Sequence, residues 1–357
     1  MGSLNYGGLE KIAVSYFENI KSHDNEFTFV VFGNEVGDLE SRIVEQGAKV
    51  IHLDHPQNNY LEYLKNINSI IKQIGPFDII HSHVLFNSGM VIKLAHHNKV
   101  PIRIVHSHSD RSHEEKTKLK KVYNKFSRML INLHATDTVA CSYNAGKYLF
   151  GEKKFKKDGQ VIVNSIEIEK YCFDQRLRND TRKELGLVDN FVLGHTGSFS
   201  TAKNHLFILE IFAKVKEKNK AAKLLLVGDG PEKEAIINRA KQLKIFTDII
   251  FVGKKDSVEK YLMAMDVFLF PSKFEGLGIS LVEAQAANLP CVISDVIPEE
   301  AIISKYTKKI SNHENTEVWV EEILRIKNFN RDYKNKKIRK YQTKNMIDQI
   351  SKLYLLS

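Results

Sequence analysis

Short apolar runs alternate with segments of helical periodicity along most of this chain. The runs have the length of buried strands, and the segments between them have the spacing of amphipathic helices. This alternation predicts an α/β fold in which parallel sheets are covered by helices. The strand candidates are Phe27–Phe32, Lys49–Leu53, Ile79–His81, Arg103–Val105, Thr138–Ala140, Val161–Val163, Phe191–His195, Lys223–Val227, Ile249–Val252, Val267–Phe270 and Cys291–Ile293.

The length of 357 residues exceeds the size at which a single hydrophobic core stops growing, so two domains are expected. The charged stretch Asp174–Leu187 lacks a strand pattern, and we place the linker between the domains there. The predicted domains are residues 1–175 and residues 176–340, and both have the same Rossmann-like alternation of strands and helices. The last segment, residues 341–357, contains an amphipathic helix.

Composition narrows the class of protein. A hydrophobic content of 43% and a charged content of 27% are ordinary for a soluble globular chain. No apolar run approaches the ~20 residues of a transmembrane helix, and no basic-then-apolar signal peptide opens the chain. The three cysteines are widely spaced and match no zinc or disulfide framework. These features predict a cytoplasmic protein.

The net charge of +10 indicates an acidic partner. One lysine-rich segment, residues 114–134, has apolar positions at helical spacing: Leu119, Val122, Phe126, Met129, Leu130 and Leu133. Two interpretations stay open. Either the apolar stripe is buried under a solvated lysine face, or the helix lies on the anionic inner face of the cell membrane. Nucleic acid is less favoured, because no recognisable binding motif accompanies the charge.

The stretch FPSKFEGLGISLVEAQAANLPCVISD, residues 270–295, runs from a buried strand through a glycine loop into a helix. Backbone N–H groups and the helix dipole make such a junction a site for anions. The loop residues are Glu275, Gly276, Leu277 and Gly278, and Glu283 follows about two helical turns after Glu275. A backbone cradle for phosphate, framed by carboxylates that can hold hydroxyl groups, indicates a sugar nucleotide as ligand.

Two further loops repeat the order of strand, small residues and helix. HTGSFSTAKNHLF, residues 195–207, places Lys203 just before a helix, where it can pair with a pyrophosphate as a point charge. LLLVGDGPEKEAI, residues 224–236, carries Gly228 and Gly230 in a turn that lets the backbone approach a ligand closely; a plain turn is the alternative.

The first half has its own candidates. Gly7 and Gly8 precede a helix and form another close-approach loop. Two His-x-His pairs end neighbouring strand candidates: His81, His83, His106 and His108. They are candidate metal ligands, but no Cys or carboxylate cluster completes such a site, so we expect no metal. Histidines that satisfy buried backbone groups are the other interpretation.

Together these motifs resemble retaining glycosyltransferases of the GT-B fold, and family 4 in particular, in which a glutamate is followed after seven residues by a second. Glu275 and Glu283 have that spacing. Within the family, the chain most resembles the enzymes that build bacterial capsular polysaccharides and exopolysaccharides. The resemblance implies two Rossmann-like domains facing a cleft, with the last helix crossing back to the first domain.

The implied reaction moves a sugar from a nucleotide-diphosphate sugar, with a UDP-sugar favoured, to the hydroxyl of a sugar or lipid-linked saccharide, without metal or cofactor. Glu283 would hold ribose and Glu275 the donor sugar, while the Gly276–Gly278 backbone and Lys203 would hold the diphosphate. His108 would contact the reacting sugar.

The resemblance also assigns supporting residues. Gly7 and Gly8 would lie near the donor phosphates or the acceptor, and Gly228 and Gly230 near the base or diphosphate. FVGKKDSVEKYL, residues 251–262, places Gly253 and Lys254 at the nucleobase.

The chain departs from the family pattern in two places. Ser198 stands where the family usually has a donor-binding arginine, and relatives place a central strand before the Gly7-Gly8 loop, with which this sequence opens. A catalytically weak binding subunit, an epimerase of the same fold and a protein that only binds acidic surfaces therefore remain alternatives.

Overall fold

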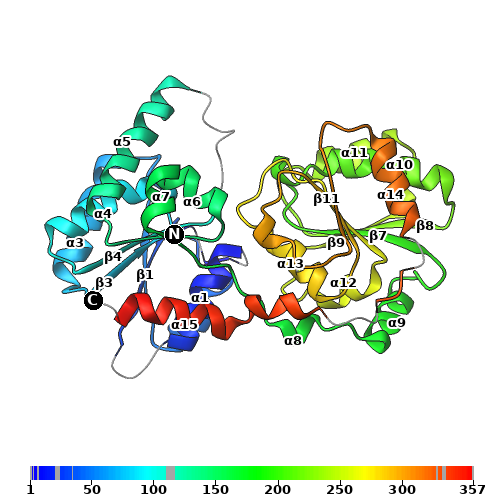
Figure 1. The fold of residues 1–357 in the computed structure, drawn as a ribbon. Helices are drawn as coiled ribbons and strands as arrows, with labels where there is room; N and C mark the ends of the chain where they lie inside the picture. Colours follow the sequence, from blue (N-terminus) through cyan, green and yellow to red (C-terminus); the bar gives the residue numbers. More distant parts are fainter. Residues whose placement is uncertain are drawn as a thin grey trace. The chain divides into compact units, whose positions relative to one another are not determined.

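A computed structural model describes residues 2, 4–5, 8–20, 25–33, 35–109, 117–326, 329–331 and 335–355. The chain forms two compact units (Figure 1). The first comprises Met1–Ser165 and Thr343–Ser357, and the second comprises Ile166–Gln342. The last helix therefore belongs to the first unit. Gly7, a predicted donor-binding residue, lies outside the described residues, and so does Asp110.

The second unit is built on one six-stranded parallel sheet in the order β12-β11-β10-β7-β8-β9. Its strands are β7 (Phe191–Thr196), β8 (Ala222–Val227), β9 (Ile249–Gly253), β10 (Val267–Phe270), β11 (Cys291–Ser294) and β12 (Thr307–Ile310). Its α-helices are α8 (Ile168–Tyr171), α9 (Gln175–Glu184), α10 (His205–Lys218), α11 (Lys233–Gln242), α12 (Glu259–Ala264), α13 (Ile279–Ala286) and α14 (Thr316–Arg325).

The first unit contains two parallel sheets. One pairs β1 (Thr28–Phe32) with β2 (Lys49–Leu53), and the other has the order β3-β4-β5-β6. The strands of the second sheet are β3 (Ile79–Ser82), β4 (Ile102–Ser107), β5 (Asp137–Ala140) and β6 (Gly159–Val161). The α-helices are α1 (Gly8–Ile20), α2 (Glu40–Val44), α3 (Tyr60–Gln73), α4 (Ser88–His97), α5 (Lys118–His134), α6 (Tyr143–Phe150), α7 (Glu152–Asp158) and α15 (Thr343–Leu355).

Burial explains why the central strands read as continuous apolar runs. Every residue of β7 and of β10 is buried, because helices cover both faces of a parallel sheet. The core of this unit is closed by Trp319 of α14, which is fully buried and meets Phe207 of α10 edge to face. The sheet can therefore hold the loops that follow its strands in fixed positions.

Three details differ from the sequence-based predictions. The strand predicted at Val161–Val163 begins two residues earlier, at Gly159. Strand β12 was not predicted, because its sequence TKKI is half lysine and lies at the sheet edge. The segment expected to be a linker instead contains helix α9, whose N-cap Asp174 accepts a hydrogen bond from the Leu177 N–H (2.9 Å).

An ion-pair network attaches α9 to the sheet. Arg178 donates to the Asp266 carboxylate at 2.5 Å, and Arg182 does so at 3.2 Å. Asp266 also accepts the Val192 N–H at 2.7 Å, so one carboxylate joins the helix to the start of β7. Burial lowers the pKa of the Arg182 guanidinium despite this carboxylate. The charges are thus withdrawn from water and depend on one another.

We predict that Asp266→Ala lowers the free energy of unfolding of the second unit by about 3 kcal/mol, because Arg182 is left buried without its anion. Denaturant unfolding followed by the fluorescence of Trp319 measures this, since Trp319 is the chain's single tryptophan. The control is Lys260→Ala, which removes a more exposed pair with Glu184 and should change stability by less than about 1 kcal/mol. Equal effects of the two variants would contradict the role given to Asp266.

Candidate functional site

The loops after β7, β8 and β10 lie together at the carboxyl edge of the second unit's sheet. Main-chain hydrogen bonds join them: the Phe199 N–H donates to the Asp229 carbonyl (2.9 Å), and the Lys273 N–H donates to the Ala202 carbonyl (2.8 Å). Ligands of open α/β sheets bind at this edge. The structure therefore brings together three of the motifs that the sequence singled out.

Glycine is required where the first two of these loops touch. Gly228 has φ +147°, and a Cβ there would lie 1.9 Å from the carbonyl oxygen of Gly197. A Cβ on Gly230 would lie 2.6 Å from the carbonyl oxygen of Phe199. The Gly228 N–H donates to the Gly253 carbonyl (2.9 Å), which fixes the end of β9 as well. The close approach that these glycines permit is thus first an approach of loop to loop.

The loop before α13 ends in a left-handed residue. Gly278 is the N-cap of the helix with φ +88° and ψ +59°, a conformation that favours glycine. The helix begins at Ile279, so its positive dipole end lies directly after the Gly276-Leu277-Gly278 backbone. Leu277 is buried and anchors the loop. This is the strand, loop and helix arrangement that the sequence predicts for binding an anion.

Lys203 and Glu275 meet at this loop cluster. The Lys203 Nζ lies 2.5 Å from Glu275 Oε1, and the two side chains are only 15% and 10% exposed. The same ammonium lies 4.8 Å from the centroid of the Phe270 ring, within range of a cation–π contact. Two predicted catalytic residues therefore form one nearly buried ion pair beside the glycine loop.

Glu283 lies within α13, and its hydrogen-bond partner could not be predicted from the sequence. The Tyr171 hydroxyl of α8 donates to Glu283 Oε1 at 2.8 Å. Burial, and then the neighbouring carboxylate, raise the pKa of Tyr171, so the phenol stays protonated and acts as a donor. The two residues are 112 positions apart, and no local motif marks Tyr171.

The remaining predicted residues of this unit are more exposed. Ser198 is exposed and its hydroxyl lies 3.2 Å from that of Ser200. Gly253 ends β9 with φ +79° and has open space where a side chain would be. Lys254 follows it and is exposed. These positions border the loop cluster through the bond between Gly228 and Gly253.

Two buried histidines lie beneath the loop, and the sequence analysis assigned them no role. The His195 ring is 4.8 Å from the His205 ring in an edge-to-face arrangement, and His195 Nδ1 lies 2.8 Å from the Leu269 carbonyl oxygen. Burial lowers the pKa of both, to about 3 for His205. They are therefore neutral supports under the positive Lys203.

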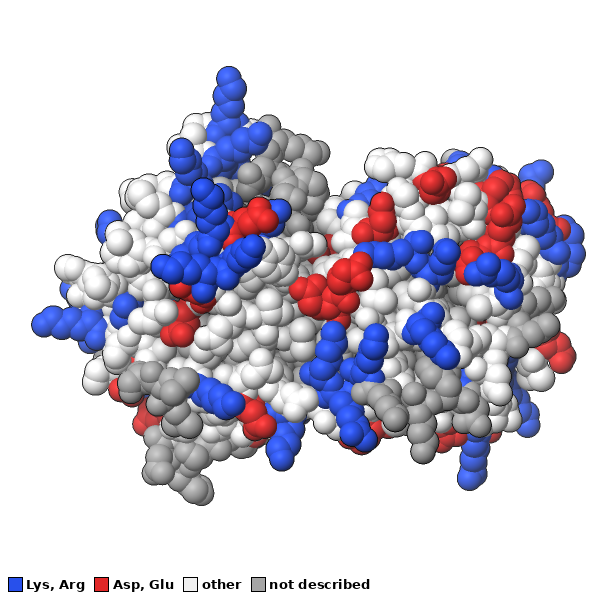
Figure 2. All heavy atoms as spheres, viewed as in Figure 1, with Lys and Arg blue, Asp and Glu red and all other residues white. Residues whose placement is uncertain are grey.

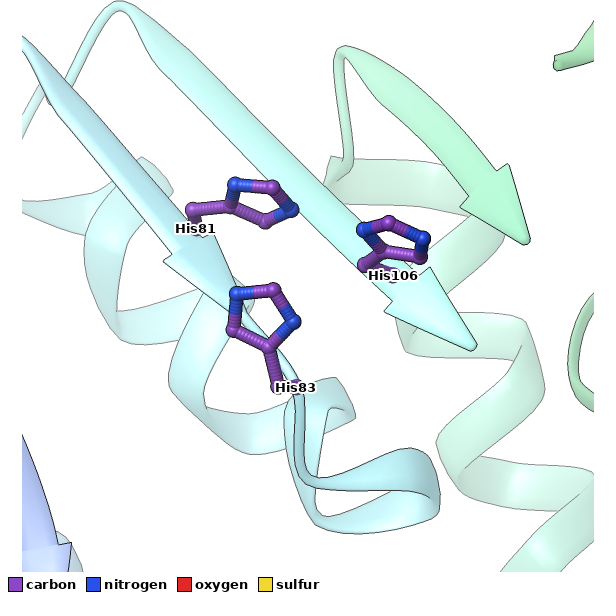
Figure 3. Close-up of side chains that lie close together, drawn as sticks. All are labelled: His81, His83 and His106. Atoms are coloured by element: carbon purple, nitrogen blue, oxygen red, sulfur yellow. The ribbon is translucent and has the colours of Figure 1, made fainter. Parts of the chain in front are cut away.

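In the first unit the two His-x-His pairs gather at the ends of β3 and β4. Figure 3 shows His81 and His83 beside His106 of the adjacent strand. His83 Nδ1 lies 2.9 Å from His108 Nε2, and His81 Nδ1 lies 2.9 Å from the hydroxyl of Tyr354. Burial lowers the pKa of all four, to about 3 for His81 and for His108. The cluster is neutral at physiological pH.

The orientation of the imidazole rings decides whether this cluster could hold a metal ion. Ring nitrogens of His81, His83 and His106 lie within 4.8 Å of one another. However, His81 and His106 are stacked with an interplanar angle of 7°. A ring nitrogen binds a metal in the plane of its ring, so stacked rings do not direct their lone pairs to one point. The arrangement favours histidines that stack on one another, with one hydrogen bond between the rings of His83 and His108.

Comparison with known proteins assigns a separate family profile to each half of the chain. Residues 178–345 match the family profile of glycosyl transferases group 1, and residues 6–170 match that of glycosyltransferase family 4. The chain is 31% identical over 337 residues to EpsF of Bacillus subtilis (strain 168), which covers 91% of this chain and 86% of EpsF. The chain is a family 4 glycosyltransferase. It is thus a retaining, metal-independent enzyme that uses a nucleotide sugar.

Other similar proteins agree with this assignment. The capsular polysaccharide biosynthesis glycosyltransferase CapH of Staphylococcus aureus is 28% identical over 315 residues, covering 86% of this chain and 83% of CapH. Among solved structures, Anabaena HepE in complex with UDP and glucose matches with a TM-score of 0.81, 16% identity and coverage of 99% and 97%. The lipopolysaccharide outer core galactosyltransferase WaaB matches with a TM-score of 0.70, 15% identity and coverage of 99% and 97%. The fold is GT-B.

The histidines at the ends of β3 and β4 generate a prediction on the pH dependence of stability. Their pKa is about 3 in the folded state for His81 and His108, against about 6.5 in the unfolded chain. Only the unfolded state takes up the protons between these values, so the stability that they contribute is complete above about pH 6.5 and is lost as pH falls toward 3. Each should contribute about 2 kcal/mol less at pH 5 than at pH 7.

Thermal unfolding followed by circular dichroism between pH 7.5 and 4.5 tests this. The double variant His81→Gln, His108→Gln should show a flatter pH dependence than the parent enzyme. His313→Gln, at an exposed position of the second unit, is the control and should keep the parent slope. An unchanged slope in the double variant would show that these rings do not titrate as described.

Proposed function

We propose that the enzyme transfers a sugar from a UDP-sugar to an acceptor hydroxyl during synthesis of a capsular or exopolysaccharide. The observation that carries the proposal is the nearly buried Lys203–Glu275 pair beside the glycine loop, with Glu283 on the helix that follows. The names of relatives support the rest: HepE has been crystallised with UDP-glucose, and CapH is a capsular polysaccharide enzyme.

Each residue receives a role from its surroundings. Glu283, oriented by a phenolic donor, holds the ribose hydroxyls, and Glu275 holds hydroxyls of the donor sugar. The Gly276–Gly278 backbone and Lys203 hold the diphosphate as negative charge develops on it. Because Lys203 is bonded to Glu275, a bound diphosphate must share this ammonium with the carboxylate or replace it. His108 contacts the reacting sugar, as a neutral imidazole.

The acceptor proposed is a sugar or a lipid-linked saccharide. One relative, an Escherichia coli enzyme 22% identical over 354 residues, is named UDP-Gal:alpha-D-GlcNAc-diphosphoundecaprenol alpha-1,3-galactosyltransferase. An acceptor on a lipid carrier would be reached from a membrane surface. Among the described residues no helix is long and apolar enough to cross a bilayer.

Helix α5 supplies a surface for such peripheral binding at the cytoplasmic face. Its N-cap Thr117 accepts the Lys120 N–H at 3.2 Å, and the helix buries Leu130 and Ile131 against the unit. Most of the predicted apolar stripe faces outward: Leu119 is 84% exposed, Val122 67%, Phe126 47%, Met129 55% and Leu133 70%. Of the two interpretations of this segment, the exposure supports membrane contact, because a buried stripe would not be accessible.

Basic residues flank this exposed stripe. Figure 2 shows lysine and arginine side chains gathered over α5 on one face of the first unit. The lysines of its first turns are Lys118, Lys120, Lys121 and Lys125. A helix with an apolar stripe between cations binds the interface of an anionic bilayer, where each lysine near the surface contributes about 1 kcal/mol.

We predict that Glu283→Gln weakens UDP binding by about 10- to 100-fold, since a charged acceptor for two ribose hydroxyls is lost. Glu275→Gln should leave UDP affinity within about threefold but lower turnover of the UDP-sugar by about 100-fold. Calorimetric titration with UDP and a nucleotide-release assay separate the two effects.

The matched control for both glutamate variants is Glu321→Gln, at an exposed position of α14, which should match the parent in binding and in turnover. Wild-type UDP affinity in Glu283→Gln would refute the ribose assignment. A folded parent enzyme that releases nucleotide from no UDP-sugar, with or without a lipid-linked acceptor extract, would refute the proposed donor.

For the membrane surface, we predict that Lys120→Glu with Lys121→Glu reduces binding to anionic vesicles at low salt by at least about tenfold. Co-sedimentation with vesicles of phosphatidylglycerol and phosphatidylcholine measures this. The same charge change at exposed positions of the second unit, Lys220→Glu with Lys308→Glu, is the control and should bind as the parent does. Equal loss in both double variants would indicate an effect of net charge alone.

A further inference from the structure

Arg331 is a buried arginine of the second unit, and its guanidinium joins the ends of two helices. Its exposed fraction is 6%. Nη1 donates to the carbonyl oxygens of Met263 (2.9 Å) and Met265 (3.1 Å) at the end of α12. Nε and Nη2 donate to the carbonyl oxygen of Ala287, the C-cap of α13, at 3.1 Å and 2.5 Å. One side chain therefore holds the carboxyl ends of α12 and α13 together.

The chemistry of arginine suits this position. The last carbonyl groups of a helix have no partner within the helix and carry the negative end of its dipole. A guanidinium offers five N–H donors in a fixed fork and can bind several of these oxygens at once, whereas an ammonium acts as a point charge. Arg331 thus binds α13 at the end opposite to the Gly276–Gly278 loop, where we propose that the diphosphate binds.

The main chain of Arg331 is bound to α13 as well. Asn288 directly follows the C-cap and has φ +54°, the left-handed conformation that commonly ends a helix. Its Nδ2 donates to the Arg331 carbonyl oxygen at 2.9 Å. Because both the backbone and the side chain of Arg331 are bonded to this helix end, the guanidinium has a fixed position relative to α13.

Glu283 lies one helical turn before this end. The Ala287 N–H donates to the Glu283 carbonyl oxygen at 3.0 Å, while the Ala287 carbonyl oxygen accepts from Arg331. Residues four apart lie on the same face of a helix. Arg331 therefore acts on the backbone of Glu283 through a single residue, Ala287.

Arg331 also reaches the Glu283 side chain, by way of α8. The guanidinium carbon of Arg331 lies 4.3 Å from the centroid of the Phe173 ring, within range of a cation–π contact. Phe173 follows Tyr171 by two residues, and the Tyr171 hydroxyl donates to Glu283 Oε1. The contacts form a closed cycle, which passes through Arg331, Ala287, Glu283, Tyr171 and Phe173.

We propose that Arg331 is a positioning residue for the donor nucleotide: it holds the end of α13 and the Phe173 ring together, and so fixes the Tyr171–Glu283 hydrogen bond in the geometry that receives the ribose hydroxyls. The inference rests on the proposed role of Glu283. Arg331 acts through Glu283 and needs no contact of its own with the nucleotide.

Calorimetric titration with two nucleotides tests this role. The probes are UDP and 2′,3′-dideoxyuridine 5′-diphosphate, which keeps the base and the diphosphate but lacks both ribose hydroxyls. The parent enzyme should bind UDP at least about tenfold more tightly, because the analogue leaves the Glu283 carboxylate without these donors. Arg331→Met should reduce this preference to about threefold or less, by weakening UDP and sparing the analogue. A general loss of folded protein would weaken both nucleotides alike and leave the ratio unchanged.

The matched control is Arg178→Met. Arg178 donates to the same two carbonyl oxygens at the end of α12, those of Met263 and Met265, at 2.7 Å each, and its third partner is Asp266. This variant should lower the melting temperature of the second unit, because buried acceptors lose a charged donor. It should keep the parent's preference for UDP.

A second variant, Phe173→Leu, tests the α8 side of the cycle while the buried guanidinium stays in place. Phe173 is half-buried, so this variant should fold. It should lower the preference for UDP by about threefold or more. Added to Tyr171→Phe, it should have no further effect on the preference, because Phe173 acts through the Tyr171 hydroxyl.

Three results would overturn the proposal. A parent preference that persists in both Arg331→Met and Phe173→Leu would remove the positioning role and leave the ribose role of Glu283 intact. Equal loss of preference in Arg331→Met and Arg178→Met would assign the effect to α12 and not to the cycle. A parent enzyme that binds both nucleotides equally would refute the ribose role itself, and the positioning role with it.

Discussion

Parallel pairing is the constraint on which the second unit depends. All its strands end at one edge, and the loops that follow them must begin there. Their backbone groups are joined across the edge, for example from Gly228 to Gly253 and from Phe199 to Asp229. The loops hold one another, and Lys203, Glu275 and the start of α13 are positioned on a rigid support. Positioned charges of this kind stabilise a leaving diphosphate without reorganisation during the reaction.

The Lys203–Glu275 pair gives this edge its chemistry. Burial of two charges costs desolvation free energy, which their mutual attraction offsets. Removal of one partner leaves the other charge buried without that compensation. Here the cation lies over the Phe270 ring and near two neutral histidines, and the Glu275 carboxylate is its ion-pair partner. An incoming diphosphate offers this cation a second anion, and the glutamate can then accept hydroxyl groups of the sugar. Binding of the two parts of the donor would be linked through one lysine.

The sequence predicted the parts that depend on local order. Glu275, Gly278 and Glu283 follow from a strand, a turn and a helix in succession, and the structure has the strand at its predicted bounds and α13 directly after the glycine loop. Tyr171 could not be found in this way, because it approaches Glu283 only after α8 packs on α13. Helix α9 was missed as a helix because its residues are almost all polar, and its stability comes from arginines that reach Asp266. Distant charge pairing leaves no periodic pattern in the sequence.

The central claim is that the loop cluster of the second unit is the donor site, and a crystal structure of the enzyme with UDP tests it most directly. We expect the diphosphate over the Gly276–Gly278 backbone, the Lys203 ammonium in contact with a phosphate oxygen, and both ribose hydroxyls on Glu283. A diphosphate bound away from this loop, with the Lys203–Glu275 pair unchanged, would contradict it.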